Sequence, residues 1–115
     1  MVKIYGIKNC NSVKKALDWM ALNNISYEFY DYKKVGAEKV VLEKFIKKFG
    51  WEKVLNRKGM TWRQLSKEEQ GNIKDENSAI NLMQEKTSII KRPLIDAGSN
   101  QLLGFDVDEY NNSLL

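Results

Sequence analysis

The residue with the greatest chemical potential is Cys10, the single cysteine of a chain that contains no histidine. It lies in the polar segment KNCNS, between an apolar segment and a stretch with helical periodicity. The nucleophilic form of cysteine is the thiolate, and a thiol with the usual pKa of about 8.5 is only slightly ionised at neutral pH. Without a histidine base, Cys10 needs another source of positive charge to act as a nucleophile.

Three features of the sequence are candidates for that charge. If Cys10 lies between the end of a strand and the start of a helix, free amides and the helix dipole favour a thiolate there. Asn11 and Ser12 are residue types that begin helices, and their backbone amides would also hold an anionic group. Lys8 is two residues from Cys10, and an arginine from a distant segment is the third candidate. The alternative is that Cys10 is a small buried hydrophobic residue.

Two arginines are of interest, and the first precedes Pro93, the only proline of the chain. An X–Pro bond at the start of a strand can be cis, and its tight backbone shape would place Arg92 beside the Cys10 loop. The alternative is an edge-strand proline with a solvated arginine. Arg57 lies in a predicted turn, NRKG, which by itself indicates a surface residue.

Hydrophobic periodicity predicts the elements that would position these residues. Strands are predicted over about 3–7 and 25–31, and the helix between them ends at Asn23–Asn24. Gly6, inside the first strand, indicates close approach of another backbone segment. A strand–helix–strand order at this spacing predicts two parallel strands joined by a crossover.

The rest of the chain is predicted to be helical in the middle and to end in a hairpin and a helix. Helices are predicted between Gly36 and Gly50, in WEKVLN, after Ser66, which has capping-box spacing to Glu69, and over about 77–85. A strand over 87–96 pairs with LLGF as an antiparallel hairpin, and a terminal helix follows, with Val107, Tyr110 and Leu114 facing inward. This order predicts an α/β fold with a mixed four-stranded thioredoxin-like sheet. We expect one domain over 1–115, in which the helices over about 36–86 lie between the two halves of the sheet.

Composition and charge exclude several classes of protein. The 115 residues are 43% hydrophobic, which is enough for a core, and no apolar run approaches the length of a membrane span. The N-terminus lacks the features of a secretory signal, and one cysteine cannot form an internal disulfide, so we expect a cytoplasmic protein. The net charge of +4 is spread along helical stretches, which does not indicate nucleic-acid binding. The residues for a zinc site of the usual kind are absent.

Six segments together resemble the arsenate reductase family called ArsC/Spx, and most of all its small YffB-type members. They extend nearly from end to end: YGIKNC, KKALDWM, YEFYDY, FGWEKVLNRKGMTWRQL, IIKRPLI and LLGF. The resemblance implies a thioredoxin-like domain with a helical insertion, in which Cys10 is the nucleophile. It implies that Arg92, before a cis Pro93, lowers the pKa of Cys10 and binds an oxyanion. It also implies that Arg57 belongs to the anion pocket.

The chain departs from this family pattern at three positions. Arsenate reductases carry a third arginine near the place of Phe105, and a histidine where Gly6 stands here. Both losses argue against an arsenate reductase, because an arsenate dianion is held by several fixed cationic donors. Spx regulators often switch through a CxxC pair, whose second position is Val13 in this chain. An internal redox switch is therefore impossible.

These observations predict a glutathione- or glutaredoxin-linked thiol reductase without a bound cofactor. Because the chain has no resolving cysteine, glutathione or a glutaredoxin must complete the cycle through a mixed disulfide. The predicted catalytic residues are Cys10 and Arg92. The residues predicted to bind the anion or thiol substrate are Lys8, Asn11, Ser12, Arg57 and Pro93.

Alternative functions remain open at this point. One is a true arsenate reductase, and another is an Spx-like regulator that binds the RNA polymerase α subunit. A third is a relic of the fold whose cysteine is buried and inert. We expect a monomer with no metal site, no direct nucleic-acid contact and no membrane partner.

Overall fold

In a computed structural model, which describes residues 1–115, the chain forms two units. Unit 1 consists of Met1–Asp31 together with Arg92–Leu115, and unit 2 is Tyr32–Lys91. Unit 2 extends beyond the predicted insertion because it also includes a short helix at its start and a 3-10 turn near its end. No helix is both long enough and apolar enough to cross a membrane.

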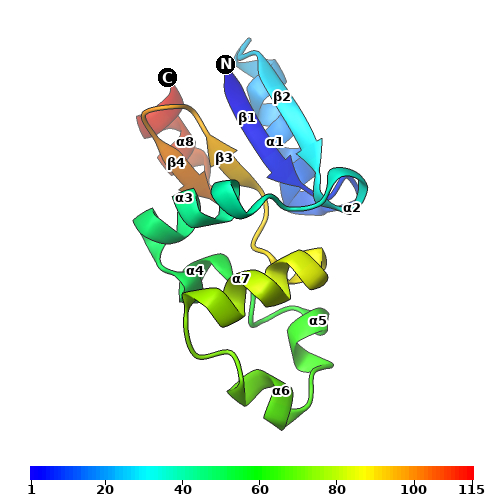
Figure 1. The fold of residues 1–115 in the computed structure, drawn as a ribbon. Helices are drawn as coiled ribbons and strands as arrows, with labels where there is room; N and C mark the ends of the chain where they lie inside the picture. The colour runs from blue at the N-terminus through cyan, green and yellow to red at the C-terminus, as the bar shows by residue number, and fades with distance from the viewer. The chain divides into compact units, whose positions relative to one another are not determined.

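Unit 1 is built on a four-stranded sheet with the order β2-β1-β3-β4 (Figure 1). Its strands are β1 (Val2–Gly6), β2 (Tyr27–Asp31), β3 (Leu94–Asp96) and β4 (Gln101–Leu103). Strands β1 and β2 are parallel, whereas β3 pairs antiparallel with both β1 and β4. The predicted mixed sheet, parallel pair and C-terminal hairpin are therefore confirmed.

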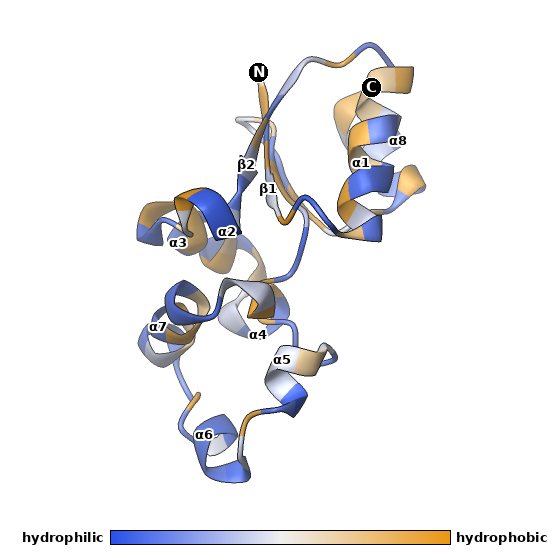
Figure 2. Ribbon diagram, turned by 90° about the vertical axis from the view of Figure 1, so that its right-hand side faces the viewer, coloured by the Kyte–Doolittle hydropathy of each residue, from blue (hydrophilic) through white to orange (hydrophobic).

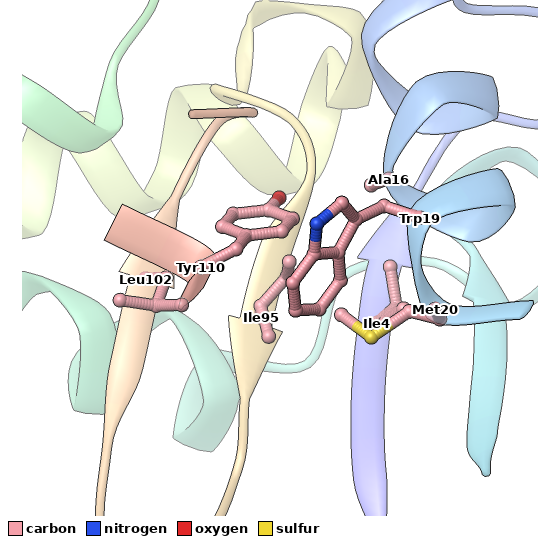
Figure 3. Close-up of a cluster of buried hydrophobic side chains, with 7 residues drawn as sticks. All are labelled: Ile4, Ala16, Trp19, Met20, Ile95, Leu102 and Tyr110. Carbon is pink, nitrogen blue, oxygen red and sulfur yellow. The ribbon is translucent and has the colours of Figure 1, made fainter. Parts of the chain in front are cut away.

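Two helices, α1 (Asn11–Leu22) and α8 (Val107–Leu114), cover one face of this sheet (Figures 1 and 2). Between them and the sheet lies a cluster of buried side chains, namely Ile4, Ala16, Trp19, Met20, Ile95, Leu102 and Tyr110. The rings of Trp19 and Tyr110 point toward one another in this cluster (Figure 3) and meet edge to face, with centroids 5.2 Å apart. Burial of these apolar surfaces holds α1 against β1, which fixes the loop between them.

Unit 2 is helical, and local sequence signals set the ends of its helices. They are α2 (Tyr32–Val35), α3 (Lys39–Phe49), α4 (Trp51–Val54), α5 (Met60–Arg63), α6 (Lys67–Gly71), α7 (Glu76–Glu85) and the 3-10 turn η1 (Thr87–Ile89). Gly50 follows α3 with a φ of 88°, a conformation that favours glycine. The predicted capping box of Ser66 and Glu69 is present at α6, which buries no residue and is largely hydrophilic in Figure 2.

The predictions differ from the structure in four places. The segment from Thr87 is a 3-10 turn rather than strand, and only Leu94–Asp96 pairs in the sheet. Tertiary contacts override the strand propensity of these residues, and one such contact is a 2.9 Å hydrogen bond between the hydroxyls of Ser88 and Thr61. The helices α2 and α5 were not predicted, because four residues are too few to show a helical period. Val107 begins α8 but is 44% exposed, so its predicted inward position is wrong.

Candidate functional site

Cys10 lies at the junction between the sheet and the first helix of unit 1. Strand β1 ends at Gly6, helix α1 begins at Asn11, and Cys10 is the N-cap residue, with an extended backbone (φ −135°, ψ 129°). Its carbonyl accepts the first helical hydrogen bond from the N–H of Lys14, at 2.9 Å. The cap is therefore the cysteine itself, not Asn11 or Ser12 as their residue types suggested. The side chain is partly exposed, so Cys10 is not a buried filler of the core.

The surroundings of the Cys10 sulfur favour the thiolate. Partial burial acts to raise the pKa of Cys10, since it removes water from the charged form. Hydrogen bonds from the N–H of Val13, the side chain of Arg92 and the N–H of Ser12 act against it, as does the charge of Arg92. Together these contributions hold the pKa below the ordinary thiol value.

Arg92 reaches the sulfur because the sheet pairs the two strands that lie next to Cys10 and Arg92 in the sequence. Strand β3 pairs antiparallel with β1, and Leu94 lies opposite Tyr5. Arg92 lies two residues before Leu94 and is partly buried in unit 1. Its peptide bond to Pro93 is cis, as the sequence suggested. Pro93 is buried, and its carbonyl accepts a 2.8 Å hydrogen bond from the N–H of Gly104.

The remaining predicted site residues lie in different surroundings. Lys8 and Asn11 are exposed in unit 1, and neither is among the groups that lower the pKa of Cys10. Arg57 belongs to unit 2, where its guanidinium carbon lies 5.8 Å from the centre of the Trp51 ring. One guanidinium nitrogen is 4.0 Å from a carboxylate oxygen of Glu52. In unit 1, therefore, the structure brings Cys10 together with Arg92 and Ser12.

The sequence missed one donor, the backbone N–H of Val13. The helical spacing of Val13 with Ala16 and Met20 predicts an inward side chain, and that of Val13 is fully buried. Its amide acts on the sulfur because it occupies the third position of α1, where an N–H has no partner inside the helix. Placing the N-cap at Cys10 in the sequence would have identified this donor.

The chemistry available at this site is that of a nucleophilic thiol beside a guanidinium and helix amides. A partly exposed thiolate can attack an electrophilic sulfur, and the same cationic donors can hold an anionic group. No group of three or more cysteine, aspartate or glutamate residues is placed to hold a metal ion.

Comparisons with known proteins bear on the family and the fold of this chain. The model of the ArsC family matches residues 5–113. An uncharacterised protein of Haemophilus influenzae is 37% identical over 110 residues, which is 96% of each chain. The solved structure of a protein named YffB superposes with a TM-score of 0.94, at 39% identity over the whole of both chains. An arsenate reductase (ArsC) related protein from Brucella melitensis is 40% identical, with a TM-score of 0.74 over 97% of this chain and 92% of its own.

Proposed function

Because this chain belongs to the ArsC family, we propose that it is a thiol reductase linked to glutathione or a glutaredoxin, with Cys10 as its nucleophile. The observation that supports this most directly is the position of Cys10 at the start of α1, within hydrogen-bonding reach of Arg92. A cysteine with a lowered pKa, partly open to solvent, has the surroundings of a reactive thiol and not of a structural one.

The proposed reaction begins with attack of the Cys10 thiolate on the glutathione sulfur of a mixed disulfide. A bond forms between Cys10 and that sulfur, the original disulfide bond breaks, and the substrate leaves as a thiolate that takes up a proton. A second glutathione thiolate then attacks the glutathione sulfur held by Cys10. This step releases glutathione disulfide and restores the Cys10 thiolate. One mixed disulfide and one glutathione thus become one free thiol and one glutathione disulfide.

The neighbours of Cys10 have separate roles in this proposal. Arg92 stabilises the thiolate when it attacks and again when it leaves, because a charge-assisted hydrogen bond is stronger to the ionised sulfur than to the neutral one. The amides of Ser12 and Val13 act in the same direction, and that of Asn11 adds to the anion-binding helix start. Pro93 would border the thiol substrate, and the exposed Lys8 gives weaker electrostatic help.

Arg57 is proposed to contribute to binding of the anionic substrate, as in the anion pocket of the family. The compartment proposed for this chemistry is the cytoplasm, where the pool of reduced glutathione can complete the cycle. The co-substrate is glutathione itself or a glutaredoxin, and no bound cofactor is needed.

Mass spectrometry after treatment with glutathione disulfide tests the proposal. We expect a single adduct at Cys10, formed within minutes near neutral pH and released by added glutathione. Cys10→Ser is the control and should form none. If wild-type protein forms the adduct no faster than an unstructured cysteine peptide under the same conditions, the proposed function is wrong.

Two other functions would give different results in parallel experiments. A true arsenate reductase would oxidise glutathione only when arsenate is added, in an assay coupled to glutathione reductase. An Spx-like regulator would bind the C-terminal domain of the RNA polymerase α subunit equally well with and without Cys10, and would show no thiol activity. The reductase proposal predicts turnover of mixed disulfides without arsenate, and its loss in Cys10→Ser.

A further inference from the structure

Gly6, the last residue of β1, lies against the two elements that surround the cysteine. A Cβ atom at this position would be 2.8 Å from Cγ2 of Val13, 3.7 Å from Cβ of Arg92 and 3.8 Å from Cε1 of Phe29. The first of these separations is shorter than real Cβ contacts allow. Val13 is fully buried, so its side chain cannot move aside into solvent. The position therefore has room for a hydrogen atom but not for a methyl group.

The backbone conformation does not account for a glycine at this position. Gly6 pairs in register with Asp31 inside the sheet, and its φ is not in the left-handed region. Four other glycines have a positive φ and no atom within 4 Å of an added Cβ, namely Gly36, Gly50, Gly98 and Gly104. They are explained by conformation, whereas Gly6 is explained by close packing. Glycine within a strand usually weakens it and often marks a place of close approach.

The two nearest side chains belong to residues that also act on the sulfur of Cys10. Val13 supplies a backbone N–H from the first turn of α1, and Arg92 supplies its guanidinium. We infer that Gly6 is a positioning residue, whose missing side chain lets the first turn of α1 close on the Cys10 sulfur beside Arg92. This inference rests on the proposed function, in which that sulfur is the nucleophile.

Gly6→Ala tests the inference, with the ultraviolet absorbance of the Cys10 thiolate followed during a pH titration. The added methyl group should push the first turn of α1 away from the sulfur, because only its contact with Val13 is too short. We expect the thiolate fraction at neutral pH to fall about three- to tenfold. Gly71→Ala is the matched control, because Gly71 lies in α6 with no atom within 4 Å of an added Cβ. The control should leave the titration unchanged.

A second pair of variants separates positioning from general loss of structure. Val13→Ala removes the Cγ2 atom that Gly6→Ala would meet, so the double variant should have space for the new methyl group. Adding Gly6→Ala to Val13→Ala should change the thiolate fraction by less than about twofold. If Gly6→Ala alone does not fold, the double variant should fold and titrate like Val13→Ala.

Three results would overturn the role of Gly6. One is a folded Gly6→Ala protein whose Cys10 titrates like wild type. Another is a fall in the thiolate fraction that is equally large when Gly6→Ala is made in wild type and in Val13→Ala. The third is a double variant that does not fold although Val13→Ala does. A wild-type Cys10 with an ordinary pKa would instead contradict the proposed function itself, so the two failures can be told apart.

Discussion

Units 1 and 2 each hold one of the two arginines that the family resemblance assigns to the site, and the surroundings of these arginines differ. In unit 1, Arg92 is partly buried and donates a hydrogen bond to the sulfur of Cys10. In unit 2, the side chain of Arg57 is 46% exposed and stands 4.0 Å from Glu52, whose side chain is 64% exposed. An exposed ion pair is screened by water and contributes little to stability. A charge beside a partly buried sulfur acts through a lower dielectric, so its interaction with a thiolate is stronger.

The way each unit brings its residues together also differs. Unit 1 joins Cys10 and Arg92, which are distant in sequence, through the pairing of β1 with β3. Unit 2 depends on local signals, such as the glycine after α3 and the capping boxes of α6 and α7. Changes in the sheet should therefore affect the chemistry of Cys10, whereas changes at the helix caps should affect only the stability of unit 2.

Cys10→Ser is expected to have the largest effect, since it removes the group that unit 1 positions. The chain has no other thiol, so turnover of a glutathione mixed disulfide should fall to the uncatalysed rate. An assay that couples glutathione disulfide to reduction by glutathione reductase would measure this. Residual turnover above background in Cys10→Ser would show that the chemistry does not depend on unit 1.

Arg92→Ala and Arg57→Ala form a matched pair, with one arginine removed from each unit. Arg92→Ala should lower the thiolate fraction of Cys10 at neutral pH about tenfold, because a hydrogen bond and a nearby charge are both lost. Arg57→Ala should have a smaller effect, since Arg57 is not among the groups that lower the pKa of Cys10. Ultraviolet titration of Cys10 would measure both.

Arg92→Lys serves as the control for charge, since it keeps the charge but not the planar array of donors. Its thiolate fraction should fall between those of wild type and Arg92→Ala. The contrast between the two arginines fails if Arg57→Ala raises the pKa of Cys10 as much as Arg92→Ala does.

Asp75 provides a test with a small effect confined to unit 2. It caps α7, and hydrogen bonds from the side chain and the N–H of Ser78 hold the pKa of its carboxyl below the ordinary value. Because the folded-state pKa is lowered, this stabilisation is complete above the unfolded pKa of about 3.9 and is lost as the pH falls through the folded pKa. Asp75→Ala should therefore lower stability at neutral pH, and its difference from wild type should shrink below about pH 4.

Amide hydrogen exchange of α7 would measure the effect of Asp75→Ala. Hydrogen exchange in α7 should increase less in Asp75→Asn, which keeps a capping oxygen, than in Asp75→Ala. The pKa of Cys10 should not change in either variant. A rise in the pKa of Cys10 in these variants would contradict the expectation that the helix caps of unit 2 affect only its stability.

Much of unit 1 could be predicted from the sequence because its elements carry clear periods and turns. The apolar spacing of α1, the alternation in β2 and the hairpin of β3 and β4 all predict elements that the structure contains. The Val13 donor was missed because the N-cap was assigned to the residues that usually cap helices, and a cysteine is not one of them. The strand length before Pro93 was overestimated, since residue types alone do not show where tertiary contacts replace strand pairing.

The predicted partnership of Cys10 with Arg92 depended on family resemblance more than on residue patterns. Nothing local in sequence shows that residues 10 and 92 meet, because their approach depends on the register of β1 and β3. The close packing at Gly6 could be expected from a glycine inside a strand, but the identity of its neighbours could not. These are long-range facts that one sequence does not contain.

The most direct measurement is the pH titration of the thiolate absorbance of wild-type Cys10, the only thiol in the chain. Helix amides and the Arg92 guanidinium should hold its pKa below the usual value of about 8.5. A midpoint at or above that value, in folded protein, would mean that Cys10 is an ordinary thiol and that unit 1 does not prepare it for nucleophilic attack.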